Sequence, residues 1–273
     1  MGVMYGVNPT WGAQTNEGRT HIATKGVVQS GLVLNLDAGV LSSYPGTGTT
    51  WTDLSGNGNN GTLTNMEVPG DYSTSNGGFL TFDGTNEFVN TNYSVNNLND
   101  ATISCWMRTS VTQKSGFFGF RTSASPGVGF DWVQFQFYIT GDTNAGTTGN
   151  YLKYDEFSGT PPSQISRSLF IGTTSITTGN WINIVATSSS TKSVVYFNGS
   201  QVAENINATQ PSRNVGATLK IGGAGDWTST QPSQMLNDYY FNGNIAIGLV
   251  YNRALTPQEI QQNFNATKSR YFS

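Results

Sequence analysis

Charged residues make up only 11% of this 273-residue chain, and its formal net charge is -3. This slight acidity, with no run of Lys or Arg, excludes nucleic acid and anionic membranes as main partners. The 12% aromatic content argues against disorder, and the 33 glycines favour short strands joined by polar turns. The length suits one large all-β domain with an additional arm.

Residues 1–30 are predicted to form an extended N-terminal arm, because glycines and a proline interrupt any helical or strand-like hydrophobic periodicity. The arm is nevertheless richer in apolar residues than a solvated tail needs, and Tyr5, Trp11 and Ile22 are its candidate anchors. Two interpretations remain open. The arm packs on its own domain, or it docks on a neighbouring subunit and becomes ordered on binding, with Trp11 buried at the interface.

The same segment lacks the charged start and apolar core of a signal peptide. No other window is long and apolar enough to span a membrane. Cys105 is the single cysteine, so no intramolecular disulfide is expected, and its alternation with Ile103 and Met107 predicts a buried thiol. These features predict a protein made in a reducing cytoplasm and released by another route, such as cell lysis.

Residues 31–273 are predicted to form one β domain. Leu32, Leu34 and Leu36 alternate along an opening strand. Phe79–Val89 is predicted to be a hairpin around Asp83-Gly84, a pair that tight turns prefer. Further strands are predicted over 101–109, 117–120, 132–139, 181–187, 193–197, 201–203 and 219–222, the last of them short and central in its sheet.

Two long stretches, 141–167 and 223–237, are predicted to be loops, and long loops on a rigid scaffold often carry binding sites. Their aromatic rings would stack on sugar rings, and nearby carboxylates would hydrogen-bond sugar hydroxyls. The candidate carbohydrate-binding residues in and beside them are Tyr151, Asp226, Trp227, Tyr239 and Tyr240. The alternative is that these loops pack locally or form subunit contacts.

The hydrophobic periodicity of the C-terminal segment changes from that of a strand to that of a helix. From Asn244 to Tyr251, apolar residues alternate as in a strand with one buried face. Thr256 then starts a short helix, with Pro257 at its first position and Glu259 completing a capping box. This strand and helix carry no catalytic residue, so their predicted role is structural.

Seven segments in order resemble the laminin G-like domains of the concanavalin A-like lectin/glucanase superfamily. The resemblance implies an antiparallel two-sheet jelly-roll sandwich with a short C-terminal helix. It covers nearly all of the chain beyond residue 30. The matching segments are Gly31–Gly39, Trp51–Gly61, Phe82–Val89, Ala101–Trp106, Val195–Gly199, Leu219–Gly223 and Asn242–Ile260.

Catalysis is not expected. The glucanase branch of the superfamily places its two carboxylates in a Glu-x-Asp-x-x-Glu motif, which is absent here. The adjacent Asp155 and Glu156 would point to opposite faces of a strand. His21 is the only histidine and lies in the arm, and zinc ligands are too few. No cofactor is predicted, and calcium stays open without an assigned ligand. The acidic residues in the matching segments are Asp37, Asp53, Asp83 and Glu87.

The segments 44–58 and 251–271 are similar to laminin G-like domains in structural proteins of tailed bacteriophages. This resemblance implies a virion protein, most simply a capsid decoration protein that docks through its arm on other virion proteins. The alternative is a carbohydrate-binding adhesin or tail-fibre module for host-surface polysaccharide, and an unrecognised glycosidase is a third interpretation. The oligomeric state is open, and a homo-oligomer is among the alternatives.

Overall fold

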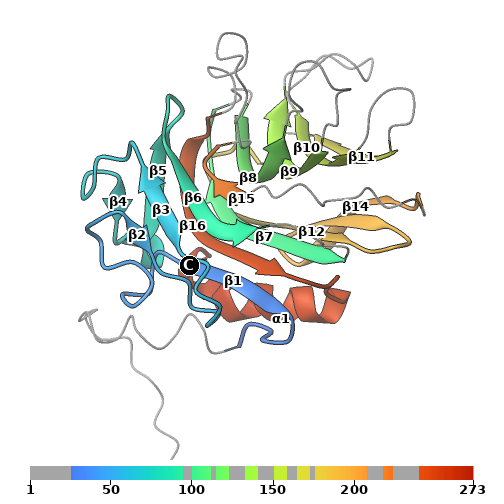
Figure 1. The fold of residues 1–273 in the computed structure, drawn as a ribbon, viewed down its shortest axis with the longest axis horizontal. Coiled ribbons are helices and arrows are strands. Elements are labelled where there is room, and N and C mark those ends of the chain that lie inside the picture. Colours follow the sequence, from blue (N-terminus) through green and yellow to red (C-terminus); the bar gives the residue numbers. More distant parts are fainter. Residues whose placement is uncertain are drawn as a thin grey trace, which may run out of the picture.

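The computed structural model describes residues 26–94, 100–111, 115–122, 133–140, 151–158, 165–172, 176–207, 209, 218–223 and 240–272. These residues form two antiparallel β-sheets stacked face to face, with one α-helix near the C-terminus (Figure 1). The predicted all-β sandwich with a short C-terminal helix is therefore confirmed. No described helix has the length and apolar composition needed to cross a lipid bilayer.

Sheet A runs β14-β13-β12-β7-β16-β5-β4, with β1 also paired to β16. Its strands are β1 (Leu32–Asp37), β4 (Tyr72–Ser73), β5 (Phe79–Asp83), β7 (Ala101–Arg108), β12 (Ile182–Ser188), β13 (Ser193–Phe197), β14 (Ser200–Asn205) and β16 (Asn242–Tyr251).

Sheet B runs β11-β10-β9-β8-β15-β6-β3-β2. Its strands are β2 (Thr50–Trp51), β3 (Gly61–Thr64), β6 (Phe88–Ser94), β8 (Ser115–Thr122), β9 (Val133–Thr140), β10 (Tyr151–Ser158), β11 (Ile165–Gly172) and β15 (Thr218–Ile221). The central position predicted for 219–222 is confirmed, because β15 lies between β8 and β6.

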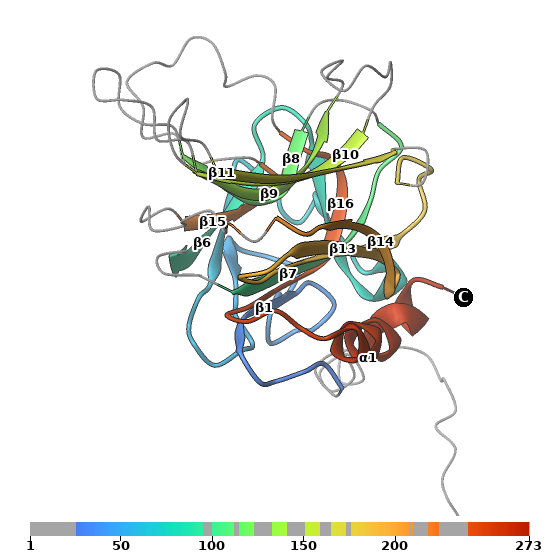
Figure 2. The same ribbon diagram turned by 90° about the vertical axis from the view of Figure 1, so that its right-hand side faces the viewer.

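Two apolar clusters lie on either side of sheet A. The first fills the space between the sheets and includes Cys105, whose thiol is buried as predicted. The second covers the outer face of sheet A, where helix α1 (Pro257–Thr267) packs. Figure 2 shows the resulting order of layers, with α1 beneath sheet A and sheet B above it.

Strand β16 is buried on both faces from Ile245 to Tyr251, so the prediction of one buried face is wrong. Two features explain this. A bulge between Ile245 and Ile247 places Ile245 in the first cluster and Ile247 in the second. The helix and the C-terminal residues then cover the face that alternation alone assigns to solvent.

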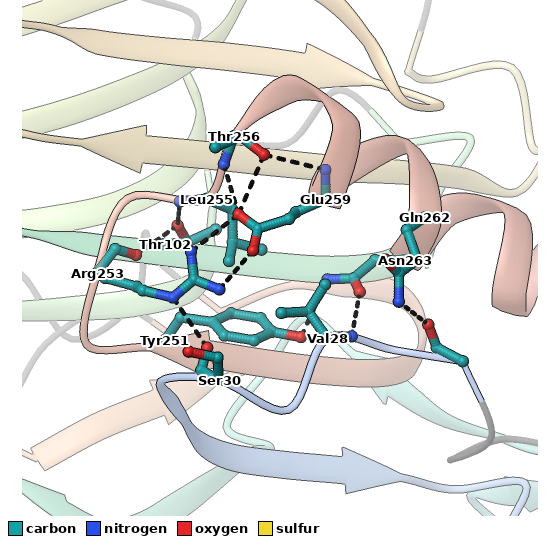
Figure 3. Close-up of polar contacts among 11 residues, drawn as sticks. Val28, Ser30, Thr102, Tyr251, Arg253, Leu255, Thr256, Glu259, Gln262 and Asn263 are labelled. Carbon is teal, nitrogen blue, oxygen red and sulfur yellow. Dashed lines mark hydrogen bonds and ion pairs between the residues drawn. The ribbon is translucent and has the colours of Figure 1, made fainter.

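Helix α1 begins as the sequence predicts. The Thr256 hydroxyl accepts a hydrogen bond from the Glu259 amide, and the Glu259 carboxylate accepts one from the Thr256 amide. Arg253 forms a bidentate ion pair with Glu259, with N–O distances of 2.8 and 2.6 Å (Figure 3). These bonds fix the turn between β16 and the helix.

Residues 26–30, which we call the anchor segment, pack on the helix. Val27 and Val28 are buried in the second cluster. The Val28 amide donates to Asn263 Oδ1 at 2.8 Å, and the Gln262 side chain donates to the Gly26 carbonyl at 2.8 Å (Figure 3). The anchor segment therefore belongs to the folded unit. Residues 1–25 of the predicted arm, including Tyr5, Trp11 and Ile22, lie outside the described residues.

Two further predictions are wrong. The turn at Asp83-Gly84 does not close a hairpin, because β5 belongs to sheet A and β6 to sheet B. The stretch 141–167 is not one long loop, because it contains all of β10 and the start of β11. Asp155 and Glu156 do lie on opposite faces of β10, as predicted: Asp155 bonds Ser168 on β11, whereas Glu156 bonds Ser188 and Ser193 of sheet A.

Candidate ligand-binding face of sheet B

One residue from each of seven neighbouring strands forms a continuous row across the face of sheet B that points away from sheet A. The pairing register sets these residues side by side. With strands about 4.8 Å apart, the row is about 28 Å long. We call it the outer row, and its members are Ser168, Asp155, Gln136, Gly119, Lys220, Asn90 and Thr62.

The residues next to these along each strand explain why the row faces outward. Leu169, Tyr154, Phe137, Leu219 and Val89 all lie in the apolar cluster between the sheets. Successive side chains of a strand point to opposite faces, so the outer row is directed away from that cluster. A sheet face that carries polar side chains in register can offer hydrogen bonds to an extended polar ligand.

Asp155, the second residue of the row, is charged and only 5% exposed. Its carboxylate accepts hydrogen bonds from the Tyr138 hydroxyl and the Ser168 hydroxyl, both at 2.5 Å. Lys153 approaches it at 2.9 Å to form an ion pair. These three donors come from β9, β10 and β11, so the carboxylate fixes the relative positions of side chains on three strands.

Gln136 lies beside Asp155 and is 2% exposed, yet its Oε1 has no hydrogen-bond partner among the described residues. Buried acceptors are normally satisfied, so this atom could accept a hydrogen bond from a ligand hydroxyl or a water molecule once the side chains over it move aside. On its other side lies Gly119, whose φ of 141° is in the region that favours glycine. Gly119 leaves a gap without a side chain between Gln136 and Lys220.

Aromatic rings lie beside the row at two places. Lys153 Nζ lies 4.7 Å from the centre of the Phe170 ring and 5.4 Å from that of Tyr138. Phe170 is 43% exposed, which is unusual for so large an apolar side chain. Farther along the row, Lys220 Nζ lies 5.1 Å from the Phe88 ring centre. Rings beside hydrogen-bonding groups suit sugars, which present both hydroxyls and apolar C–H faces.

Two of the predicted binding residues are among the described ones. Tyr240 packs beside Phe88, with ring centroids 6.4 Å apart, near the Lys220 end of the row. Tyr151 is the first residue of β10, two residues before Lys153, and its side chain lies outside the described part. Asp226, Trp227 and Tyr239 also lie outside the described residues, so their assignment stays a prediction.

Sequence reasoning missed the outer row itself. The signal was present in part, because Gln134 and Gln136 alternate with apolar residues in the predicted strand 132–139. The register that aligns Gln136 with Asp155 and Lys220 depends on pairings between distant segments, which no local pattern encodes. The row could therefore be found only from the folded chain.

The four carboxylates in the sequence motifs serve the protein's own donors. Asp37 binds Arg270, and Asp53 accepts hydrogen bonds from the amides of Asn35, Ser55 and Asn59. Asp83 accepts the Thr85 amide, and Glu87 accepts the Asp83 amide. Among the described residues, no three His, Cys, Asp or Glu side chains gather as metal ligands.

Comparison with known families agrees with this architecture. A laminin G-type family model, described as concanavalin A-like lectin/glucanases superfamily, matches residues 83–261, more than half of the chain. The chain belongs to this superfamily. No curated protein matches the sequence closely enough to count as a relative.

Several solved structures share the fold. Domain 4 of AbnA, an extracellular GH43 arabinanase from Geobacillus stearothermophilus solved with arabinotriose, has a TM-score of 0.55 and 19% identity over 85% of this chain and 97% of its own. The binding domain of Paraclostridial Mosquitocidal Protein 1 has a TM-score of 0.55 and 14% identity over 87% of this chain and 52% of its own.

The binding domain of botulinum neurotoxin DC, solved in complex with SialylT, has a TM-score of 0.55 and 13% identity over 88% of this chain and 52% of its own. The chain thus spans about half the length of the two toxin binding domains. Identities this low establish a shared fold only.

Proposed function

We propose that this chain is a non-catalytic glycan-binding display protein. Residues 1–25 dock it on a larger assembly, and the outer row of sheet B binds a carbohydrate on the opposite side. The observation that carries the proposal is the outer row, with its polar side chains in register and the exposed Phe170 ring beside it. The half-buried or exposed members of the row are Ser168, Lys220, Asn90 and Thr62. These groups offer a sugar both hydrogen bonds and an apolar surface.

The anchor segment supports the docking half of the proposal. It is fixed to α1, which covers the outer face of sheet A, whereas the outer row lies on the far face of sheet B (Figures 1 and 2). A partner that docks next to the anchor segment would leave the outer row directed outward. The setting we propose, from the sequence resemblance, is the virion of a tailed bacteriophage, with the chain as a capsid decoration protein.

The described part of the outer row also supports binding without turnover. Glycosidases need two carboxyl groups on either side of the scissile bond. In the outer row Asp155 is the one carboxylate, and it is held by Lys153, Tyr138 and Ser168. No second carboxyl group of the row stands across from it to complete such a pair.

The first test is a glycan array followed by titration calorimetry on the strongest hit. The array includes arabino-oligosaccharides, because the AbnA domain was solved with arabinotriose. Phe170→Ala is expected to weaken binding about tenfold, or about 1.4 kcal/mol. Val202→Ala is the matched control, because Val202 is also 43% exposed but lies on β14 of sheet A. Equal affinities of both variants and the parent chain would refute the site.

The docking half has its own test. Deletion of residues 1–25 should abolish incorporation into phage particles while leaving the glycan affinity unchanged. Incorporation is measured by mass spectrometry of purified virions, and affinity by the same titration. Normal incorporation of the shortened chain would refute docking through the arm without affecting the glycan assignment.

A further inference from the structure

A cavity of about 570 Å³ opens at a different place, beside the C-terminus of the chain. Its lining comes from the end of β7, the segment before β12, the β13–β14 turn and the last described residues. Trp181 and Tyr271, two of its lining residues, belong to the cluster on the outer face of sheet A. The cavity is therefore separate from the outer row, and its volume suits a small ligand.

Arg108 gives the cavity a fixed positive charge. Its Nε donates to Asn244 Oδ1 at 2.7 Å, and its guanidinium carbon lies 4.9 Å from the Phe79 ring centre and 5.1 Å from that of Trp181. The terminal nitrogens bind no acceptor among the described residues. None of the described lining residues is Asp or Glu. A guanidinium held in this way is suited to binding an anion.

Two buried polar atoms in the cavity wall lack partners. Trp181 is 6% exposed and Tyr271 is 8% exposed, yet neither Trp181 Nε1 nor the Tyr271 hydroxyl has a hydrogen-bond partner among the described residues. Leaving a buried donor unsatisfied costs about 1–3 kcal/mol. Both atoms are closed off from solvent, so a ligand with several oxygens would supply the missing partners only together with a movement of the Trp181 or Tyr271 side chain.

The rim combines amides with an exposed ring. The side chains of Asn76 and Asn180 line the cavity and make no hydrogen bonds within the described residues. Phe272, which is 46% exposed, adds an apolar wall. Amides bind hydroxyls, and an aromatic wall accommodates the C–H face of a sugar ring.

We propose that this cavity binds an acidic sugar unit, a hexuronate whose carboxylate pairs with Arg108. The ring hydroxyls would face Asn76 and Asn180, and the ring would lie against Phe272. This site is additional to the outer row, and its assignment does not depend on the glycan that the outer row binds.

The test uses three probes and one local signal. Methyl β-D-glucuronide, methyl β-D-glucoside and sodium acetate are titrated into the full chain while the indole N–H resonance of Trp181 is followed by NMR. Trp181→Phe identifies this resonance among those of the six tryptophans. The glucuronide is expected to shift this resonance until the site is saturated. The glucoside should need at least a tenfold higher concentration for the same shift, and acetate should give no saturable shift.

Three variants complete the test. Arg108→Met keeps the aliphatic stem and should raise the dissociation constant for the glucuronide at least tenfold. Asn180 lies on an exposed loop, so Asn180→Ala is not expected to unfold the domain. It should raise the dissociation constant for the glucuronide about threefold. Val202→Ala should leave it unchanged, because Val202 is not among the residues that line the cavity. No shift with the glucuronide, an equal response to the glucoside or to acetate, or unchanged binding by Arg108→Met and Asn180→Ala would overturn the proposal.

Discussion

Gly39 is a single residue on which three segments depend. It follows β1 at a point where Arg270, near the C-terminus, forms an ion pair with Asp37 at 2.8 Å. The same guanidinium donates to the Gly77 carbonyl at 2.9 Å. A Cβ on Gly39 would lie 1.7 Å from the Gly77 oxygen and 2.1 Å from Arg270 Nη2. Any side chain here would separate these groups.

Gly39→Ala is therefore expected to lower the free energy of unfolding by about 1–3 kcal/mol or more, because a clash with backbone has no simple relief. Gly172→Ala is the control, since a Cβ at Gly172 meets nothing within 4 Å. Urea unfolding of both variants measures the difference. Equal midpoints for the two would contradict the packing described at Gly39.

Glu87 links stability to pH. Burial raises the pKa of its carboxyl from 4.5 to about 7, and the charges of Asp71 and Asp83 act in the same direction, while the hydrogen bond from the Asp83 amide opposes them. Because the folded-state pKa is above the unfolded one, this group favours folding most below pH 4.5. That advantage is lost as the pH rises through 7.

Glu87→Gln removes this titration while keeping an acceptor for the Asp83 amide, which lies 2.6 Å from Oε2 in the parent chain. The stability of the variant relative to the parent chain should increase between pH 4.5 and pH 8. Urea unfolding at several pH values measures this. A difference between the two chains that does not change with pH would show that Glu87 does not titrate in this range.

At the scale of elements, the closing strand and helix could be predicted because their signals are local. The alternation along β16 and the Thr256–Glu259 capping box lie within a few residues of one another. The bulge at Ala246 and the burial of both strand faces depend on β7 and α1, and were missed. The Asp83-Gly84 turn was misassigned because the dipeptide indicates a tight turn but not which sheet the chain enters next.

Strands β10 and β11 were missed because buried charges break their apolar alternation. Glu156 is fully buried and accepts hydrogen bonds from Ser188 and Ser193 of sheet A. Arg167, also fully buried, donates to the carbonyls of Ser189 and Ser190. In a sequence, charged residues at inward-facing positions of a strand resemble those of a loop. Their burial is explained only by hydrogen-bond partners that lie far away along the chain.

The anchor segment gives an element-scale prediction from two truncations. Deleting residues 1–25 should leave the melting temperature nearly unchanged, because Val27, Val28 and their bonds to α1 remain. Deleting residues 1–30 also removes two buried valines, whose burial contributes about 3 kcal/mol or more to the free energy of unfolding. This deletion should lower the melting temperature by at least about 6 °C.

Differential scanning calorimetry on the two shortened chains measures this contrast. Equal melting temperatures would mean that residues 26–30 add no stability to the domain.

At the scale of the whole molecule, the sandwich separates two surfaces. The helix and the anchor segment cover sheet A, and the outer row occupies the far side of sheet B. Rigid stacking of two sheets keeps these surfaces at a constant distance and orientation. Under the proposed function, docking on the side of sheet A would leave the outer row accessible.

Hydroxyl-radical footprinting with a neutral glycan from the array can show whether the outer row binds carbohydrate. Phe170 on sheet B and Phe272 at the C-terminus are chemically identical and almost equally exposed, at 43% and 46%. The bound glycan is expected to slow oxidation of Phe170 and to leave that of Phe272 unchanged. Protection of Phe272 alone, or unchanged oxidation of Phe170 at saturating glycan, would contradict the assignment of the outer row.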